Sequence, residues 1–590
     1  MPKKIIVFGA GYAGIEAALT LQKKKKKSDD LEITLIDRNS YHTLLTELHE
    51  VAGNRISEDG VIIPLRDIFK YTDVKLIKDE ITGVDFNTNT VTAKSGEYHY
   101  DYLIIAAGSE PNYYNIHGLK ENGFPLWSYD DSIRIREHIK ECFVKASQES
   151  NPEIKRSLLT FVVGGGGFTG VEVIGEIAQW VKSLCREYDI SHKYIRLVLV
   201  EALDKILNNL QNKSINKAVS YLTIKLGVEI LTGSAISKVS ADSIEINDKL
   251  VIPTNTLIWT AGVKASDISG KIDIDKAKGF RLKVNEFTQT QYKNVYAAGD
   301  ISAFISEGHT LPALVEAAIQ TGNAAAKNIL ADIRGKEKQE LKPKLHGVMV
   351  SVGSFFAVTD IMGYQFNRLL SIAIKYLVNI HYLFGIGGFE LVIRYIKHEF
   401  LFKQQEKFLI EKHYSMLTPT FWIVPIRLFL GYAWLKEGYQ KILDGWLTTP
   451  MLAGTVDANS SASVTEAGEK VFRIISDHTP FWYAWIAQNF VIPNALVFQI
   501  LIVLAEVGLG LAFISGTLNF IAGLAALALN VNFLLSTGLL ESTWWMIPAE
   551  ICMLAGAGRA FGVDYYLIPY LMRQWRYVVR NRRIKLWLFD

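Results

Sequence analysis

The sequence predicts an α/β fold for residues 1 to about 400 and an all-α membrane fold for the rest of the chain. Two patterns favour the α/β fold. Short Val/Ile-rich strands alternate with helical patterns, and two of these strands run into a glycine-rich turn that opens a helix. From about residue 421 the chain changes to long apolar stretches rich in Trp, Phe and Leu, which are typical of membrane helices. With 590 residues it is long enough for several domains.

The two glycine-rich turns follow one pattern. They lie in IIVFGAGYAGIEAAL and LTFVVGGGGFTGVEVI, with glycines at Gly9, Gly11, Gly14, Gly165, Gly167 and Gly170. Each turn is followed by a strand that ends in an acid, Asp37 in the first case and Glu201 in the second. Such a turn lets the backbone approach a pyrophosphate at a helix N-terminus, and the acid accepts a hydrogen bond from a ribose hydroxyl. Two Rossmann-type dinucleotide sites in one chain predict a redox enzyme.

Charge and cysteine content exclude some classes of function. The formal net charge is only +3, so no broad basic face is available and we expect no nucleic-acid partner. The three cysteines, Cys142, Cys185 and Cys552, are far apart and show no CxxC spacing. This pattern fits a reducing compartment and excludes a redox-active cysteine pair. We assign no metal site.

Three later segments are expected to contribute further residues to the dinucleotide sites. They are DYLIIAAGSEPN (101–112), which contains Ala107-Gly108, TNTLIWTAGV (254–263), which contains Gly262, and NVYAAGD (294–300), which ends in Gly299-Asp300. In this order, the segments resemble the two-dinucleotide-binding-domain flavoproteins. The resemblance implies that the second domain is inserted in the first, that the N-terminal site holds FAD, and that the inserted site binds NADH or NADPH. An acid at Glu201, with no cation at Ala202 or Leu203, favours NADH because it repels a 2′-phosphate.

Within that superfamily, residues 1 to about 400 resemble the type II NADH:quinone oxidoreductases most. Five stretches carry the resemblance: YHTLLTELHEVAGN (41–54), with His42 and Thr46; GGGGFTGVEV, with Glu172; ALVEAAIQTGN (313–323); HGVMVSVGS (346–354); and LLSIAIKYLVNIHYLF (369–384), with Lys375. One departure stands out, because the AQ of the family's AQxAxQ helix is Val315-Glu316 here, while Gln320 keeps the pattern. Glu316 either changes recognition of the quinone or other acceptor, or pairs with a nearby cation.

The resemblance implies the following site residues. FAD would contact Gly9, Ala10, Gly11, Tyr12, Ala13, Gly14, Asp37, Arg38, His42, Thr46, Ile81, Ala107, Gly108, Gly299, Asp300, Val315, Glu316 and Lys375. NADH would contact Gly165, Gly167, Gly170, Glu201 and Gly262, and the quinone would contact Thr46, Glu316, Gln320 and Lys375. Glu172 is the candidate catalytic residue. It either holds a proton or a nicotinamide hydrogen bond near the flavin, or only complements the helix dipole.

Residues 369–384 are apolar except for a narrow stripe formed by Ser371, Lys375 and Asn379. The segment is too short and too charged to span a membrane, so we expect a helix at the membrane interface or a buried helix of the α/β part. Both interpretations hold if Lys375 points back toward the flavin.

Four spanning helices are predicted at about 419–438, 489–513, 517–538 and 543–562. The basic flanks, placed in the cytoplasm by the positive-inside rule, are Lys403, Lys407 and Lys412 before the first helix and Arg573, Arg576, Arg580, Arg582, Arg583 and Lys585 after the fourth. No secretory signal precedes the first strand. We therefore expect a multi-pass protein of the cell (inner) membrane with its catalytic domain on the cytoplasmic side.

The C-terminal part resembles the DoxX/DoxD-like four-helix membrane proteins through RLFLGYAWLKEGYQKILDGW (427–446). Four polar residues, Glu506, Asn530, Asn532 and Glu550, fall within its apolar helices. Intramembrane carboxylates face a bundle interior, where they form a functional site or tie the bundle together. An anchor, a quinone site and an ion path all remain open.

The expected domains are an FAD-binding domain in two parts (1–115 and 286–345), an NADH-binding domain (116–285), a membrane-interface region (346–412) and a DoxX-like transmembrane domain (413–590). The expected activity is non-proton-pumping transfer of a hydride from NADH to FAD and of two electrons to a quinone of the menaquinone type. An alternative is electron transfer to a non-quinone acceptor, or oxidant defence, through the membrane domain. Expected partners are the quinone, NADH and the lipid bilayer, and the family also suggests a homodimer.

Overall fold

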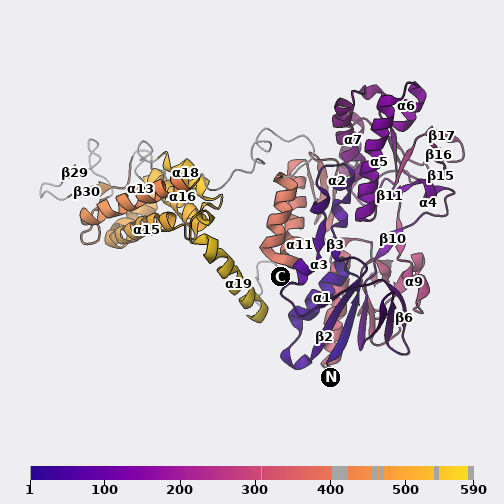
Figure 1. Cartoon of the computed structure of the whole chain (residues 1–590), viewed down its shortest axis with the longest axis horizontal. Helices are drawn as coiled ribbons and strands as arrows, with labels where there is room; N and C mark the ends of the chain where they lie inside the picture. The colour runs from indigo at the N-terminus through magenta and orange to yellow at the C-terminus, as the bar shows by residue number, and fades with distance from the viewer. Residues whose placement is uncertain are drawn as a thin grey trace. The chain divides into compact units, whose positions relative to one another are not determined.

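The computed structural model describes residues 2–306, 308–401, 423–453, 463–464, 470–476, 479–536 and 544–582. The chain forms two compact units, Met1–Ser415 and Met416–Asp590 (Figure 1). The first unit contains the parallel sheets and the second is mainly helical.

The first sheet has the order β21-β9-β1-β2-β5 and is parallel throughout. Its strands are β1 (Lys3–Phe8), β2 (Leu31–Asp37), β5 (Lys75–Lys78), β9 (Tyr102–Ile105) and β21 (Val295–Ala297). Ile5, Ile6 and Val7 in β1 are all buried, as expected for a central strand covered on both faces. Helices α1 (Tyr12–Lys24) and α10 (Val315–Ile333) pack together beside this sheet.

The second sheet, β11-β18-β12-β13-β14, is also parallel. Its strands are β11 (Phe124–Pro125), β12 (Thr160–Gly164), β13 (Arg196–Val200), β14 (Val228–Leu231) and β18 (Thr256–Trp259), and its long helices are α5 (Tyr129–Gln148) and α7 (Phe168–Glu187). All of these elements lie between β9 and β21 in the sequence, so this domain is inserted in the first. The prediction of an α/β fold with parallel sheets is confirmed.

Smaller elements complete the first unit. The remaining helices are α2 (Leu48–Ala52), α3 (Leu65–Phe69), α4 (Leu119–Asn122), α6 (Pro152–Leu158), α8 (Asn212–Ser220) and α9 (Ile268–Lys271). The antiparallel strands are β6 (Ile81–Asp85), β7 (Thr90–Ala93) and β8 (Gly96–His99) in one sheet, β15 (Ile236–Val239), β16 (Ser243–Ile246) and β17 (Leu250–Pro253) in another, and β25 (Gly347–Ser351), β26 (Ala357–Ile361) and β27 (Tyr364–Asn367) in a third. Short antiparallel pairs join β3 (Tyr41–Thr43) to β4 (Ile62–Pro64) and β10 (Ser109–Pro111) to β19 (Val263–Ala265).

Helix α11 (Leu369–Ile396) is longer than the predicted 369–384 segment, and η8 (Lys397–Leu401) follows it. The predicted polar stripe faces inward, because Ser371 and Lys375 are buried and Asn379 donates to Glu47 of the α/β core. Leu369, Leu377 and Phe389 are exposed on the outer side. The helix thus has an apolar outer face, while Lys375 points back into the protein.

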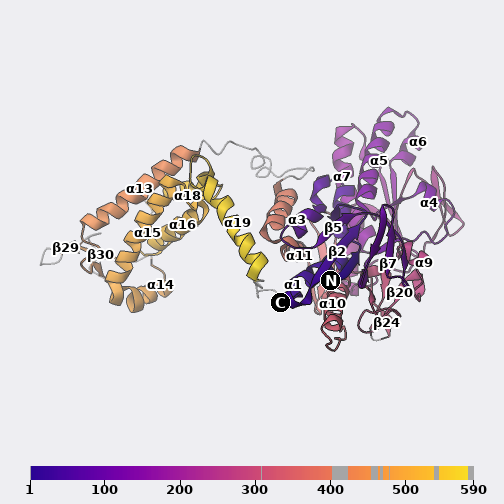
Figure 2. The same cartoon turned by 60° about the horizontal axis from the view of Figure 1, so that its bottom comes forward.

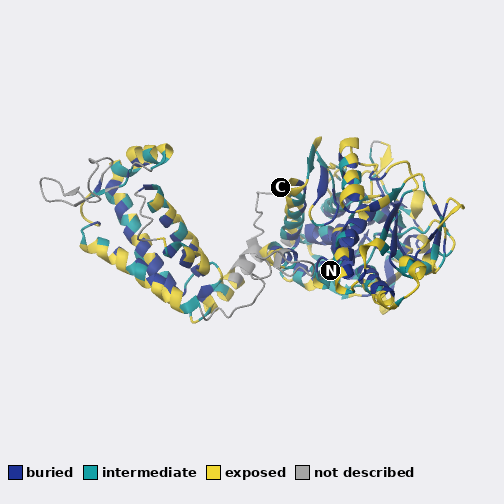
Figure 3. Ribbon diagram, turned by 90° about the horizontal axis from the view of Figure 1, so that it is seen from above, coloured by how far each residue is buried: buried dark blue, intermediate teal, exposed yellow. Residues whose placement is uncertain are grey.

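The second unit packs α13 (Val424–Leu443), α15 (Ala495–Ser515), α16 (Asn519–Ser536) and α18 (Met546–Met553) side by side (Figure 2). Two further helices are α14 (Phe481–Ile486) and α19 (Asp564–Arg582). The unit also contains a small sheet of the strands β28 (Leu452–Ala453), β29 (Ser463–Val464) and β30 (Lys470–Arg473), which differs from the prediction of an all-α fold. Exposed and buried residues alternate along its helices (Figure 3), and many exposed residues are large and apolar, including Leu501, Leu504 and Phe520.

Within the described residues, three helical segments are long and apolar enough to cross a membrane: Leu369–Glu399, Phe481–Ser515 and Asn519–Ser536. Two of the predicted spans, 489–513 and 517–538, fall on the last two segments. The predicted 419–438 span begins outside the described residues and overlaps α13, which carries several charges, and the 543–562 span overlaps the eight-residue helix α18. Of the flanking cations used to predict orientation, Lys403, Lys407, Lys412, Arg583 and Lys585 lie outside the described residues.

Candidate active site

The first glycine turn is shaped for close backbone approach. Gly9 has φ of +103°, and a Cβ there would lie 2.4 Å from the carbonyl oxygen of Ala106. Gly11, at the N-cap of α1, faces open space. At the end of β2, Asp37 accepts hydrogen bonds from the backbone N–H groups of Ala10 and Asn39, both at 2.7 Å. Burial raises the pKa of Asp37. A helix N-terminus, an open glycine and an adjacent acid fit a dinucleotide pyrophosphate and ribose.

The second glycine turn repeats this geometry. Gly165 has φ of +111°, and a Cβ there would lie 2.8 Å from the backbone nitrogen of Ala261. Gly167 is the N-cap of α7 and also faces open space. Glu201 accepts from the backbone N–H of Gly166 at 2.6 Å and of Leu203 at 2.8 Å. Both turns therefore hold an acid against the glycine loop in the same local geometry.

The third piece of the first site is Asp300. Its carboxylate accepts from the Ser109 hydroxyl at 2.7 Å, and burial raises its pKa. Asp300 and Gly299 line a small cavity together with Arg281, Ser302, Leu311, Pro312, Ala317, Ala318 and Thr321. The cavity lies at the N-terminal part of α10. A Cβ on Gly299 would lie 3.0 Å from the Ala13 Cβ, so this segment also approaches the first glycine turn.

Other predicted flavin residues occupy varied places. His42 is buried, contacts the carbonyl of Ala10 at 3.1 Å and the Tyr382 hydroxyl at 3.0 Å, and burial lowers its pKa to about 4. The ring of Tyr12 lies 4.8 Å from the His42 ring. Arg38 and Thr46 are exposed. Ile81 is buried in the apolar core below the small β6-β7-β8 sheet, so only its backbone is available to a ligand.

Glu316 and Gln320 both contact the segment that precedes β25. Glu316 contacts both the ring and the backbone N–H of His346. The Gln320 amide donates to the carbonyl of Lys344 at 2.6 Å and accepts from its N–H at 2.9 Å. Of the two interpretations of Glu316, the structure shows a pairing, with a histidine as its partner.

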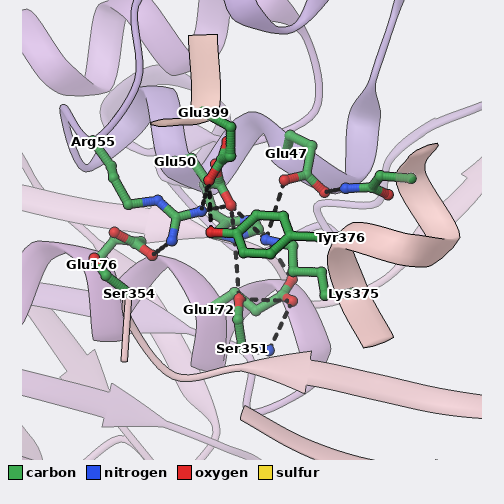
Figure 4. A network of polar contacts seen from close by, with 12 residues as sticks. Glu47, Glu50, Arg55, Glu172, Glu176, Ser351, Ser354, Lys375, Tyr376 and Glu399 are labelled. Carbon is green, nitrogen blue, oxygen red and sulfur yellow. Dashed lines mark hydrogen bonds and ion pairs between the residues drawn. The ribbon is translucent and has the colours of Figure 1, made fainter. Parts of the chain in front are cut away.

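Sequence reasoning missed a buried polar cluster around Glu172 and Lys375 in the first unit (Figure 4). Its carboxyl groups are those of Glu47, Glu50, Glu172, Glu176 and Glu399, and its permanent cations are Lys375 and Arg55. Lys375 binds Glu50 and lies 3.1 Å from Glu47. Arg55 binds Glu50 and lies 3.5 Å from Glu176 and 3.4 Å from Glu399.

Glu172 itself joins this cluster to β25. Its carboxylate accepts from the backbone N–H and the hydroxyl of Ser351 at 3.2 and 3.3 Å, and lies 3.7 Å from the His49 ring. Burial raises the pKa of Glu172 to about 7, although Lys375 and Ser351 oppose that rise. Burial also raises the pKa of Glu176 and holds the pKa of His49 well below its usual value.

The charge balance of the cluster indicates that it stores protons. Four buried carboxyls and the 15% exposed Glu172 face two permanent cations, with His49 neutral, so full ionisation would leave three uncompensated negative charges. Burying an unpaired charge is far more costly than protonating a carboxylate. Some of these carboxyls therefore carry protons near neutral pH, and Glu172 is the member that lies at the start of α7, beside the second glycine turn.

Comparison with known proteins adds independent findings. A model described as "Pyridine nucleotide-disulphide oxidoreductase" matches residues 3–322. Proteins named type II NADH:quinone oxidoreductase from Staphylococcus saprophyticus and Staphylococcus aureus are 30% identical over 397 residues, which is 66% of this chain and 98% of each relative.

Two solved structures share the fold. A structure titled as NDH2 from Plasmodium falciparum in complex with NADH superposes with a TM-score of 0.62 at 19% identity, covering 69% of this chain and 100% of that one. The sulfide:quinone oxidoreductase of Aquifex aeolicus gives a TM-score of 0.55 at 17% identity, covering 70% and 96%. From the family match and the staphylococcal relatives, the chain belongs to the pyridine nucleotide-disulphide oxidoreductases and, within them, to the type II NADH:quinone oxidoreductases.

Proposed function

We propose that this chain is a membrane-bound, non-proton-pumping dehydrogenase that oxidises NADH and reduces a quinone of the menaquinone type through bound FAD. The observation that carries the proposal is the pair of equivalent glycine-turn sites in one unit, with a buried, proton-holding cluster that includes Glu172. When bound, FAD supplies the redox chemistry by accepting a hydride and giving up two electrons.

The residues of the first site fit FAD. The open Gly11 and the helix N-terminus suit a pyrophosphate, and Asp37 suits a ribose hydroxyl. Asp300, held by Ser109 at the cavity beside α10, is placed to bond the ribityl and pyrophosphate region. We assign FAD binding to residues 1–115 and 286–345, with Val315, Glu316 and Lys375 as further contacts.

We assign NADH binding to residues 116–285, with contacts from Gly165, Gly167, Gly170, Glu201 and Gly262. Glu201 orients its carboxylate within the glycine loop, where it can accept from a free 2′-hydroxyl and repel a 2′-phosphate.

Proton supply falls to Glu172. Reducing a quinone to a quinol takes two electrons and two protons; the hydride of NADH brings one proton equivalent, so one more proton is needed per turnover. A neutral Glu172 carboxyl supplies this proton, and the carboxyls of the buried cluster then reprotonate Glu172.

The membrane parts follow from apolar surfaces. Residues 346–412, with the exposed apolar face of α11, lie at the membrane interface, and residues 413–590 form a DoxX-like multi-pass domain. The catalytic unit faces the cytoplasm, and two chains pair as a homodimer. The quinone contacts Thr46, Glu316, Gln320 and Lys375.

The test is a steady-state assay of the full chain. The purified protein should hold about one FAD per chain and oxidise NADH with short-chain menaquinone and ubiquinone analogues. Protein that folds with FMN, or without flavin, would contradict the FAD assignment. Activity with oxygen or ferricyanide but with neither quinone would contradict the choice of acceptor.

A further inference from the structure

Three interior residues of α13 are spaced by seven: Arg427, Trp434 and Lys441. Seven residues rise about 10.5 Å along a helix and return to nearly the same face. Arg427 and Trp434 are fully buried, and the Lys441 side chain is 19% exposed. The apolar bundle of the second unit therefore contains a column of polar groups at three levels.

Both ends of this column are held by charged side chains that contact neighbouring segments. At one end, the Arg427 guanidinium donates to the carbonyl oxygens of Ala557 at 2.7 Å and Ala560 at 2.8 Å. At the other end, Lys441 pairs with both carboxylate oxygens of Glu506, at 2.7 and 2.9 Å. These contacts tie the segments of the bundle together, although within the described residues the buried Nε of Arg427 has no hydrogen-bond partner.

The middle level is incomplete. One oxygen of Glu550 accepts from Trp434 Nε1 at 3.2 Å and from Asn530 Nδ2 at 2.7 Å. Within the described part of the chain, the other Glu550 oxygen and the Asn530 amide oxygen have no hydrogen-bond partner. Glu550 is 0% exposed and Asn530 is 4% exposed, so bulk water does not solvate these atoms. Unpartnered buried polar groups are rare because each costs free energy.

The chemistry of this level points to a neutral ligand. Among the described residues, the side chains that donate to Glu550 are the neutral Trp434 and Asn530, whereas Glu506 has the Lys441 cation. An uncompensated carboxylate is unfavourable inside an apolar bundle, so Glu550 carries its proton. Its free oxygen then presents a hydroxyl donor beside the Asn530 acceptor, and the surrounding wall is apolar, with Leu430, Ala526 and Met546.

We propose that Glu550 and Asn530 bind the head group of a quinone inside the membrane unit. A quinone carbonyl accepts from the Glu550 hydroxyl, and a quinol hydroxyl donates to the Asn530 amide oxygen. The choice of a quinone rests on the proposed function, because that reaction gives the chain a lipid-soluble ligand with these two groups. The site binds and releases the ligand; no electron transfer is assigned to it.

The test uses the full chain in lipid nanodiscs and a photoreactive short-chain azidoquinone, with labelled peptides mapped by mass spectrometry. Label is expected in α16 or α18 and should be displaced by unlabelled quinone. Glu550→Met and Asn530→Leu should each weaken binding at these helices about tenfold, as expected for losing a hydrogen bond to the ligand. Glu550→Gln should keep binding, because a neutral amide still donates and accepts.

Asn532→Leu is the matched control. Asn532 lies two residues from Asn530 on α16 and bonds Tyr483 instead, so its loss should leave labelling unchanged. Thermal unfolding of each variant separates loss of binding from loss of fold, and Glu550→Gln serves if Glu550→Met does not fold. Absence of displaceable label in α16 and α18 of the wild type would overturn the proposal and leave a buried water as the partner. Label that is equal in Glu550→Met and wild type would overturn it as well. NADH oxidation and labelling of the first unit are scored separately, so failure of the dehydrogenase assignment remains distinguishable.

Discussion

Opposing effects act on the Glu172 carboxyl. Burial disfavours its anion, while Lys375 and the Ser351 N–H favour it, and the balance puts its pKa at about 7. A group with this pKa loses and regains a proton near neutral pH, which suits a general acid. The neighbouring carboxyls matter because a proton donor that is used in every turnover must regain its proton from another group. Glu176, one helical turn along α7 and with its pKa also raised by burial, is placed among the cluster's other carboxyls.

A Glu172→Gln variant tests this role. In the wild type, kcat for quinone reduction should fall as pH rises through about 7, since Glu172 loses the proton it donates. The variant should bind FAD normally, lack that inflection and turn over roughly a hundredfold more slowly. The measurement is the pH profile of kcat with a soluble quinone. If the variant keeps the wild-type rate and inflection, Glu172 serves only the helix dipole.

Glu201 sets nucleotide choice at the same scale. Wild-type kcat/KM should favour NADH over NADPH by roughly 10- to 100-fold, because one hydrogen bond is replaced by repulsion of a 2′-phosphate. Glu201→Gln should narrow that ratio by removing the negative charge. Asp204→Asn, an exposed carboxyl three residues on, is the control and should not change it. Equal use of both nucleotides by the wild type would refute the role given to Glu201.

At the scale of elements, the sequence predicted the dinucleotide sites but not the buried cluster, for different reasons. The strand, glycine turn, helix and terminal acid of each dinucleotide site are local patterns, so Gly9, Asp37, Gly165 and Glu201 could be placed from spacing alone. The buried cluster could not be found this way, since Arg55 and Glu399 are more than 300 residues apart and meet only after folding. The available signal was weak: acids at 47 and 50, and at 172 and 176, share a helical face.

The same reasoning explains α11. Its periodicity predicted one polar stripe, but the sequence alone did not show whether Lys375 meets solvent, lipid or buried acids. In the structure Lys375 docks the helix onto α2 and its preceding turn through Glu50 and Glu47. The exposed apolar side of the helix is therefore held outward by a buried ion pair.

Lys375→Met should therefore destabilise the first unit. Removing one partner of a buried pair leaves uncompensated charge and costs about 3–5 kcal/mol, unless the acids take up protons. The temperature at which flavin is released should fall. Leu377→Met, on the exposed face of the same helix, is the control. Equal release temperatures for Lys375→Met and this control would show that the pair does not hold α11.

For the whole molecule, the division into two compact units poses the question of what the second unit contributes. The first unit, Met1–Ser415, contains both dinucleotide sites, the Glu172 cluster and the apolar face of α11. The second contains the polar column of α13 and two of the helical segments that are apolar enough to span a membrane. The residues proposed for catalysis thus lie in the first unit, whereas two of the three candidate membrane-spanning segments lie in the second.

Truncation after Ser415 separates the two contributions. The shortened chain should still oxidise NADH and reduce a soluble quinone analogue, because the residues proposed to bind FAD and NADH and to take part in quinone reduction lie in the first unit. It should leave the membrane with salt or mild detergent, since α11 offers an interfacial face but no multi-pass anchor. The affinity for a long-chain quinone in vesicles should fall, because the truncated chain lacks the proposed binding site at Glu550 and Asn530. The measurements are membrane partitioning, reduction of the flavin by NADH, and steady-state rates with soluble and lipid-borne quinones. If the truncated chain reduces its flavin with NADH but passes no electrons to the soluble quinone, the membrane unit takes part in catalysis itself and the assignment of the quinone site to the first unit fails.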